Sequence, residues 1–208
     1  MAARRFLALG DSYTIGEQVP AEQRWCNQLS RLEWGGTELG TPLIIAQTGW
    51  TADELEVALD QAEQNQIAPP YDLVSLLIGV NDQYRGREAE SFAPAFSRLL
   101  TRAIGYAGGD ARRVLVVSIP DWGVTPFARE EGRDRSIVAA EIDAYNQLSR
   151  GLSESAGVHY VGITDLTREA AKRPELLAGD GLHPSGSDYG RWASRIQGYL
   201  LEQGWPFD

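Results

Sequence analysis

Short apolar runs with strand character alternate with helix-like runs along the whole chain. The apolar runs cover residues 5–9, 42–46, 73–78, 114–119 and 159–163. The middle runs are continuously apolar, which is typical of parallel strands that are covered by helices on both faces. The alternation therefore predicts a three-layer α/β/α sandwich built around a five-stranded parallel sheet.

Apolar residues recur at helical spacing between these runs, over residues 25–32, 55–62, 92–103, 138–152 and 189–200. We interpret these stripes as helix faces that pack against the sheet. Thr51, with Glu54 three residues later, predicts a capping box at the start of the second helix. Ser187 is a candidate cap for the last helix, and Pro94 fits the third helix only in its first turn. Residues 120–133, rich in Gly, Pro and charge, are predicted to form a long loop.

The length and charge of the chain limit its organisation and its partners. The chain has 208 residues and a formal net charge of −10. This length predicts a single domain over residues 1–208. The negative charge repels nucleic acids and anionic lipids, which argues against both as partners. The negative charge does not exclude small neutral substrates. The oligomeric state is not determined by these features.

The N-terminal residues 1–9 imitate a signal peptide, because two arginines precede an apolar run. That run is shorter than the roughly 7–15 residues of a signal-peptide core. No stretch approaches the roughly 18 apolar residues of a membrane-spanning helix. These features predict a cytoplasmic protein without membrane insertion, with secretion as the alternative if the sequence is that of an already trimmed chain. Cys26 is the only cysteine and is predicted to be an inert core thiol, and no Cys/His cluster has the spacing of metal ligands.

Polar residues follow the first three predicted strands at the points where those strands end. Ser12 lies in Gly-Asp-Ser after the first strand, Gly49 follows the second, and Asn81 follows the third. In open α/β sheets, ligands bind outside the carboxyl ends of the strands. Asp180 and His183, in the sequence Asp-Gly-Leu-His-Pro before the last helix, can reach the same edge. We therefore expect these five residues to converge on one site.

The residue types at this edge predict acyl transfer. Ser12 would be the nucleophile, His183 the base, and Asp180 the acid that orients and stabilises the base. The order Ser, Asp, His matches α/β-hydrolases, but the G-x-S-x-G motif of those enzymes is absent because Thr14 replaces its second glycine. The oxyanion would be bound by the amides of Ser12 and Gly49 and by the Asn81 side chain. A glycine at position 49 lets the backbone approach the substrate closely.

Four sequence blocks together resemble the SGNH (GDSL-type) hydrolase family of esterases and lipases. They are Gly10-Asp11-Ser12, Gly49, Gly79-Val80-Asn81-Asp82 and Asp180-Gly181-Leu182-His183-Pro184, and they extend from position 10 to position 184. The resemblance implies a flavodoxin-like α/β/α fold and no cofactor. It assigns the nucleophile to Ser12, the base to His183 and the orienting acid to Asp180. It also implies an oxyanion hole formed by Ser12, Gly49 and Asn81. The chain departs from the family pattern at Tyr13, where Leu is usual, and in the residues around Gly49.

Three other polar residues are predicted to have structural roles, and five aromatic residues are predicted to line a pocket. Asp11 and Asp82 are predicted to form local turns, and His159 is predicted to lie in the sheet or at its edge. Five aromatic residues near the blocks are predicted to line an acyl or aromatic pocket. They are Tyr13, Trp50, Tyr84, Trp122 and Phe127.

The sequence thus predicts a serine hydrolase that cleaves small or medium acyl esters or thioesters through an acyl-enzyme on Ser12. An acyltransferase that uses the same three residues is an alternative, because the same chemistry serves both reactions. A non-catalytic binding module is the second alternative, and the presence of both Ser12 and His183 argues against it. The natural ester is not specified by these motifs.

Overall fold

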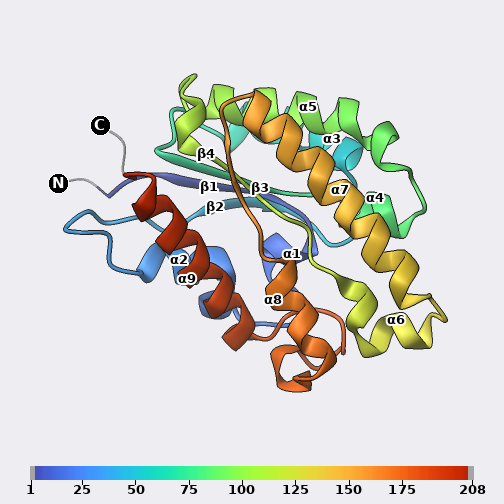
Figure 1. Ribbon diagram of the computed structural model, residues 1–208. Helices are drawn as coiled ribbons and strands as arrows, with labels where there is room; N and C mark the ends of the chain where they lie inside the picture. Colours follow the sequence, from blue (N-terminus) through green and yellow to red (C-terminus); the bar gives the residue numbers. More distant parts are fainter. Residues whose placement is uncertain (1–2, 206–208) are drawn as a thin grey trace.

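A parallel five-stranded sheet forms the centre of the computed structural model, which describes residues 3–205 (Figure 1). The strands are β1 (Phe6–Gly10), β2 (Leu43–Ala46), β3 (Leu73–Leu77), β4 (Val114–Val117) and β5 (His159–Val161). Their order across the sheet is β2-β1-β3-β4-β5, and every neighbouring pair is parallel. This is the flavodoxin-like order. The predicted fold class is confirmed, and the predicted strands shift by only one or two residues at their ends.

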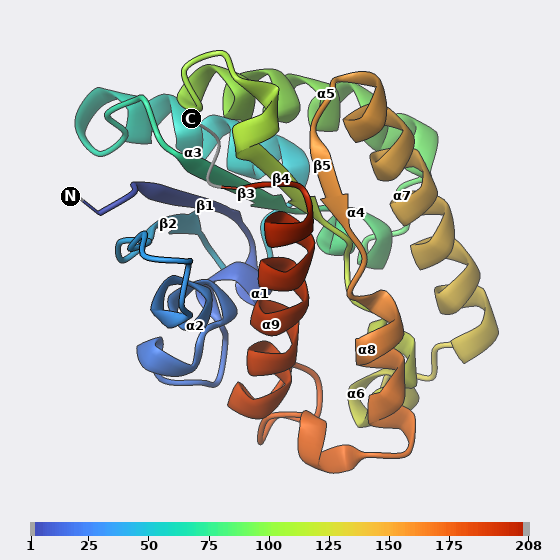
Figure 2. The ribbon, with the colours of Figure 1, turned by 60° about the vertical axis from the view of Figure 1, so that its left-hand side comes forward.

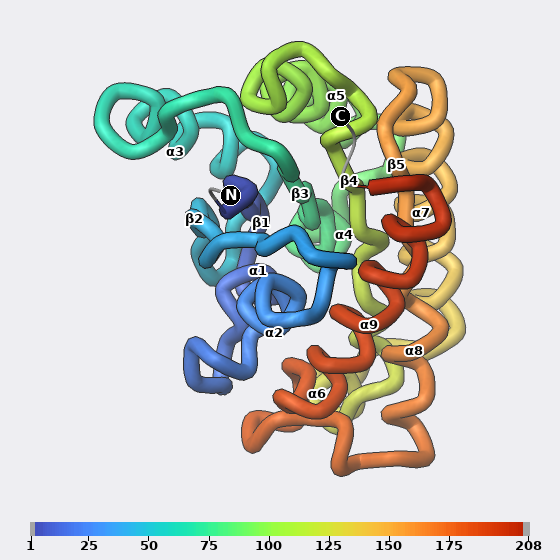
Figure 3. Tube along the Cα trace, turned by 90° about the vertical axis from the view of Figure 1, so that its left-hand side faces the viewer, coloured from blue at the N-terminus to red at the C-terminus, as the bar shows by residue number. Residues whose placement is uncertain are grey.

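Helices cover both faces of the sheet (Figures 1 and 2). The longer ones are α2 (Trp25–Arg31), α3 (Ala52–Asn65), α5 (Ala89–Tyr106), α7 (Arg135–Ser155) and α9 (Gly186–Glu202). The short ones are α1 (Ser12–Ile15), α4 (Val80–Tyr84), α6 (Pro126–Glu130) and α8 (Thr164–Arg168). Figure 3 shows α3, α5 and α7 on one side of the strands and α2 with α9 on the other.

The pairing register brings the carboxyl ends of β1, β2 and β3 level with one another. Gly10, the last residue of β1, pairs with Ala46 on one side and with Leu77 on the other. Each of these residues is the last of its strand. The segments that follow the three strands therefore leave the sheet at the same edge, as the sequence predicts.

Close packing at the end of β1 requires a glycine. A Cβ added to Gly10 would lie 2.2 Å from the Thr14 Oγ1 atom and 2.4 Å from the Leu77 carbonyl oxygen. Both distances are far below van der Waals contact. The absence of a side chain therefore allows the chain to turn directly from β1 into α1 beside β3.

The helix signals in the sequence are partly confirmed. The capping box at α3 is present, since the Thr51 side chain accepts from Glu54 N and Glu54 accepts from Thr51 N. The prediction for Pro94 is wrong, because α5 begins at Ala89 and Pro94 is in its second turn. Because proline has no N–H, Pro94 leaves the carbonyl of Glu90 without its helical partner. Both residues are exposed. The cap of α9 is Ser185 rather than Ser187.

The stretch 120–133 is less irregular than predicted. A short 3-10 turn, Trp122–Val124, is followed by α6, which starts at Pro126. Thr125 caps α6 by accepting a hydrogen bond from Ala128 N. Proline at the first helical position has no N–H to lose and a suitable φ, so the same proline that suggested a loop starts a helix.

Two further features bear on the sequence predictions. Cys26 is buried in the core, and burial raises the pKa of its thiol to about 12, which keeps it protonated and unreactive, as predicted. Within residues 3–205, none of the helices combines the length and the apolar character needed to cross a bilayer.

Candidate active site

Ser12 is held in the tight turn that joins β1 to α1. Asp11 caps α1, and its Oδ1 atom accepts a hydrogen bond of 3.0 Å from the Tyr13 amide. Ser12 is the first residue of the helix and is almost fully buried, with 4% of its surface exposed. The turn thus fixes the hydroxyl at the edge of the sheet where the first three strands end.

The loop that carries Asp180 and His183 is closed by backbone hydrogen bonds. Ala178 N donates to the His183 carbonyl at 2.7 Å, and Ser185 N donates to the Leu176 carbonyl at the same distance. Inside the loop, Asp180 Oδ1 accepts hydrogen bonds of 3.0 Å from the amides of Leu182 and His183. The carboxylate therefore organises the backbone of its own loop.

Asp180, His183 and Ser12 form a continuous chain of hydrogen bonds. Asp180 Oδ2 lies 2.6 Å from His183 Nδ1, and His183 Nε2 lies 3.0 Å from Ser12 Oγ. With the proton on Nδ1, the ring donates to the carboxylate and its Nε2 accepts from the Ser12 hydroxyl. The structure thus brings the three predicted residues together, with His183 between Asp180 and Ser12.

Hydrogen bonds set the charge of Asp180, and aromatic packing sets the position of the His183 ring. Partial burial opposes the charge on Asp180, but hydrogen bonds from the His183 ring and from the loop amides outweigh it. The pKa of Asp180 therefore lies below its usual value. The buried ring of Tyr13 packs against the His183 ring at a centroid distance of 5.0 Å and stacks on Trp192 at 6.5 Å. Tyr13 thereby restricts the position of the imidazole.

Gly49 and Asn81 lie beside Ser12, as predicted. Gly49 has a φ of +83°, a left-handed conformation that favours glycine. Asn81 is the second residue of α4, and its Nδ2 atom donates to the Trp50 carbonyl at 3.0 Å. A longer contact of 3.4 Å joins Nδ2 to Asp11 Oδ2. The carboxamide is therefore oriented by the segments that follow β1 and β2.

A cavity of about 150 Å³ opens at this point. Its lining residues are Ser12, Tyr13, Thr48, Gly49, Val80, Asn81, Tyr84, Trp122, Phe127, Leu182 and His183. Four of the five predicted aromatic residues are among them. Trp50 is not, because its side chain packs against the core and only its carbonyl takes part in the site. Three lining residues, Thr48, Val80 and Leu182, were not predicted, although they lie inside the sequence blocks that carry Gly49, Asn81 and His183.

The aromatic wall of the cavity is a connected cluster. The Trp122 ring lies 5.2 Å from the Tyr84 ring and 6.1 Å from the Phe127 ring. Trp122 Nε1 donates to Gln83 Oε1 at 2.7 Å, and the Arg133 guanidinium lies 5.3 Å from the centre of the Trp122 ring. These contacts orient the Trp122 indole, which is the buried member of the wall.

The other residues that the sequence singled out have varied roles. Asp11 forms a local turn as predicted, and it also contacts Asn81. The prediction for Asp82 is wrong, because this buried carboxylate accepts from Ala52 N at 2.9 Å, thirty residues away, and pairs with Arg87. A buried charge requires such partners. His159 begins the edge strand β5, as predicted, and its Nδ1 atom lies 3.2 Å from the Tyr199 hydroxyl.

In the part of the chain that the structure describes, no group of three or more His, Cys, Asp or Glu side chains is arranged to hold a metal ion.

Comparison with known proteins places these observations in context. The GDSL-like Lipase/Acylhydrolase family matches residues 8–190, which includes every block of the candidate site. None of the curated proteins matches the chain.

Several solved structures are similar to the whole chain. A catalytic mutant of an acetylxylan esterase from Geobacillus stearothermophilus has a TM-score of 0.71 at 16% identity, covering 96% of this chain and 95% of its own. A psychrotrophic esterase from Pseudoalteromonas sp. has a TM-score of 0.67 at 17% identity, with 97% and 98% covered. A carbohydrate acetylesterase from Sinorhizobium meliloti has a TM-score of 0.65 at 21% identity, with 96% and 99% covered. At these identities the likeness supports the fold.

Asp11 makes the free energy of unfolding of the protein dependent on pH. Burial raises the pKa of Asp11 to about 8, and the charge of Asp82 adds to the rise. The folded state therefore retains a proton that the unfolded chain releases above its pKa near 3.8. The resulting stabilisation is complete below that value and is lost as the pH rises through about 8.

We expect Asp11→Asn to remove this dependence, since the amide has no proton to lose and its oxygen still accepts from Tyr13. Chemical denaturation at pH 5 and pH 8 measures the effect. The free energy of unfolding of the wild type should fall between the two by at least about 1.4 kcal/mol more than that of the variant, the equivalent of one pKa unit. Parallel pH profiles for the two proteins would contradict this interpretation.

Proposed function

The chain belongs to the GDSL-like lipase/acylhydrolase family, and on that premise we propose that it hydrolyses carboxylic esters through an acyl-enzyme formed on Ser12. The observation that carries the proposal is the unbroken hydrogen-bond chain from Asp180 through His183 to Ser12, with distances of 2.6 and 3.0 Å. A nucleophile, a base and an orienting acid within hydrogen-bond reach are the requirements of this chemistry.

The first half of the reaction begins with attack of Ser12 Oγ on the ester carbonyl carbon. The hydroxyl proton passes to His183 Nε2 as the new carbon–oxygen bond forms, and the carbonyl oxygen becomes an oxyanion. The ionised Asp180 stabilises the imidazolium through its contact with Nδ1. When the tetrahedral intermediate collapses, His183 returns the proton to the leaving alkoxide and the alcohol departs, which leaves the acyl group on Ser12.

The oxyanion needs donors that are already in place, since reorienting them during the reaction would raise the barrier. We assign this role to the amides of Ser12 and Gly49 and to the Asn81 side chain, which line one cavity. The second half of the reaction repeats these steps with water. His183 takes a proton from the water as it attacks the acyl carbon, and then returns that proton to Ser12 Oγ.

The cavity favours a small acyl group. Its volume of about 150 Å³ is below the roughly 300–1,000 Å³ of typical ligand sites. An engineered cavity of about 150 Å³ in another protein holds benzene, a molecule of six carbon atoms. Because the reacting ester atoms occupy part of the space beside Ser12, we assign acyl chains of about two to four carbon atoms to the aromatic end.

The roles of the triad residues are tested by single substitutions. Ser12→Ala and His183→Ala should each lower kcat for a short p-nitrophenyl ester on the order of 10⁴-fold or more. The matched control is His159→Ala, which removes the other histidine of the chain, one that does not line the cavity. This control should keep kcat within about threefold of the wild type. Similar losses for His159→Ala and His183→Ala would overturn the assignment of the base.

The acyl-size preference is tested with p-nitrophenyl esters of increasing chain length. We expect kcat/KM to be highest from acetate to butyrate and to fall at least about tenfold for octanoate, since one methylene is worth about 1–3 kcal/mol in a tight pocket. Phe127→Ala removes a half-buried ring from the aromatic wall. It should raise the ratio of kcat/KM for octanoate to kcat/KM for acetate about tenfold. Acetate hydrolysis by the same variant is the internal control. A wild type that prefers octanoate would refute the size limit.

A further inference from the structure

We propose that Arg85 is a positioning residue for the oxyanion hole, which fixes the Gly49 loop (residues 47–51) against helix α4. The inference rests on the proposed esterase function, since it concerns the amide of Gly49 as an oxyanion donor. Arg85 lies just beyond the last residue of α4 and does not line the cavity. It therefore acts on the reaction through the loop rather than through the substrate.

Helix α4 and Arg85, the residue that follows it, hold the Gly49 loop and the start of α3 at three successive points. Asn81 Nδ2 donates to the Trp50 carbonyl at 3.0 Å, and Asp82 Oδ2 accepts from Ala52 N at 2.9 Å. Arg85 Nη2 donates to the Gly49 carbonyl at 2.8 Å. Asn81 and Arg85 are four residues apart, a spacing that places both on the same side of a helix. The helix that supplies one oxyanion donor thus also holds the backbone of another.

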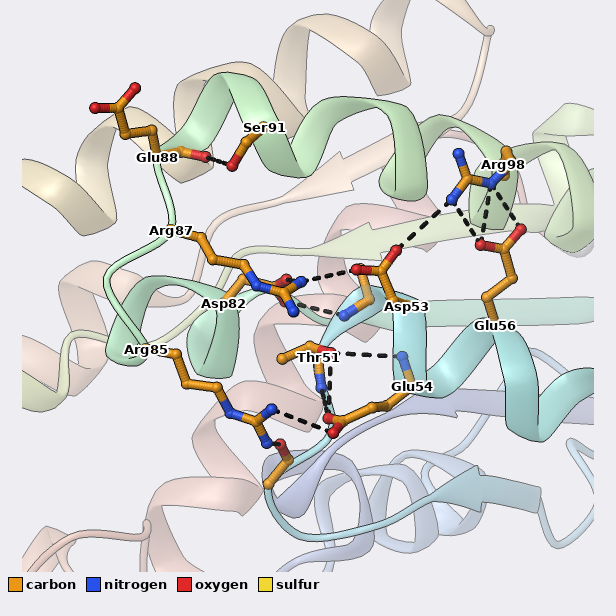
Figure 4. A network of polar contacts seen from close by, with 12 residues as sticks. Thr51, Asp53, Glu54, Glu56, Asp82, Arg85, Arg87, Glu88, Ser91 and Arg98 are labelled. Atoms are coloured by element: carbon orange, nitrogen blue, oxygen red, sulfur yellow. Dashed lines mark hydrogen bonds and ion pairs between the residues drawn. The ribbon is translucent and has the colours of Figure 1, made fainter.

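The Arg85 guanidinium joins the loop to the first turn of α3. Its Nη1 atom lies 3.2 Å from Glu54 Oε1, while Glu54 Oε2 accepts from Thr51 N at 2.8 Å (Figure 4). The Thr51 amide and the guanidinium lower the pKa of Glu54, so the carboxylate is charged at neutral pH. Arg85 therefore connects the Gly49 carbonyl with the capping box of α3, and its fork of donors suits two partners at once.

The Gly49 residue needs such external support. A Cβ built at Gly49 would have no heavy atom within 4 Å, so no packing of side chains surrounds the position. Glycine also has more backbone freedom than any other residue. The neighbouring residue Thr48 is tied separately, since its hydroxyl donates a hydrogen bond to the Glu17 carboxylate. The direction of the Gly49 N–H thus depends on the hydrogen bonds that hold the loop. The hydrogen bond from Arg85 is the one made to Gly49 itself, at its carbonyl oxygen.

This role is separable from a contribution to stability. The side chains of Arg85 and Glu54 are each 45% exposed, and ion pairs with that exposure stabilise folded proteins little. Loss of Arg85 should therefore change the turnover number rather than the melting temperature. A donor that is displaced from the oxyanion weakens transition-state binding without weakening ground-state binding.

The experiment compares Arg85→Ala with Arg98→Ala, using a short p-nitrophenyl ester. Arg98 is 53% exposed and also pairs with α3, through Glu56 and Asp53, but it does not contact the Gly49 loop. We expect Arg85→Ala to lower kcat about tenfold with KM within about twofold, a fraction of the 10²–10³-fold loss typical for removal of a whole donor. Arg98→Ala should leave both constants unchanged, and the two variants should have similar Tm values. Arg85→Lys, which retains one charged donor, should recover part of kcat.

Glu54→Gln provides a second test that does not remove the arginine. Glutamine at this position preserves the capping box but loses the charge that holds the guanidinium, so kcat should fall about threefold. This variant decides the question if Arg85→Ala does not fold. Equal kcat for Arg85→Ala and Arg98→Ala, or a loss expressed only in KM, would overturn the proposal. A wild type inactive toward all esters would instead refute the proposed function, which distinguishes the two failures.

Discussion

The site depends on the register of three parallel strands. Gly10 pairs with both Ala46 and Leu77, so the chain leaves β1, β2 and β3 at one level. A shift of one residue in either pairing would move the following segment along the sheet by about 3.3 Å and reverse its side-chain directions. The hydroxyl of Ser12, the loop of Gly49 and the carboxamide of Asn81 would then no longer meet. The buried core of the sheet therefore determines the geometry of the chemistry.

Burial and hydrogen bonding divide the charged residues of the site into two groups. Asp180 is a quarter exposed at its side chain and accepts hydrogen bonds from the His183 ring and from the loop amides, so its pKa lies below the usual value and it remains ionised. Asp11 is fully buried with fewer donors, and burial raises its pKa to about 8. The pKa values of two aspartates close to Ser12 are thus shifted in opposite directions. The difference arises from their surroundings, since both are aspartates.

Local sequence patterns were sufficient to predict the sheet, the three residues of the hydrogen-bond chain and the neighbours of Ser12. Periodicity identifies buried strands, and the topology of parallel sheets places their carboxyl ends together. Contacts between separate blocks were not predictable in this way. Asp82 contacts Ala52 across 30 positions and Arg85 contacts Gly49 across 36, and no local pattern records such pairs. Proximity in sequence predicts Trp50 in the cavity, but its partly buried side chain packs against the core instead.

The central claim is that a covalent acyl-enzyme on Ser12 lies on the reaction path. Rapid quenching of the wild-type protein during turnover of p-nitrophenyl acetate, followed by mass spectrometry of its peptides, tests this claim most directly. We expect a burst of p-nitrophenol and a peptide containing Ser12 that is heavier by one acetyl group. Acetyl transfer to another residue, such as Ser185, or turnover with no covalent adduct and no burst under conditions where deacylation is slow, would contradict it.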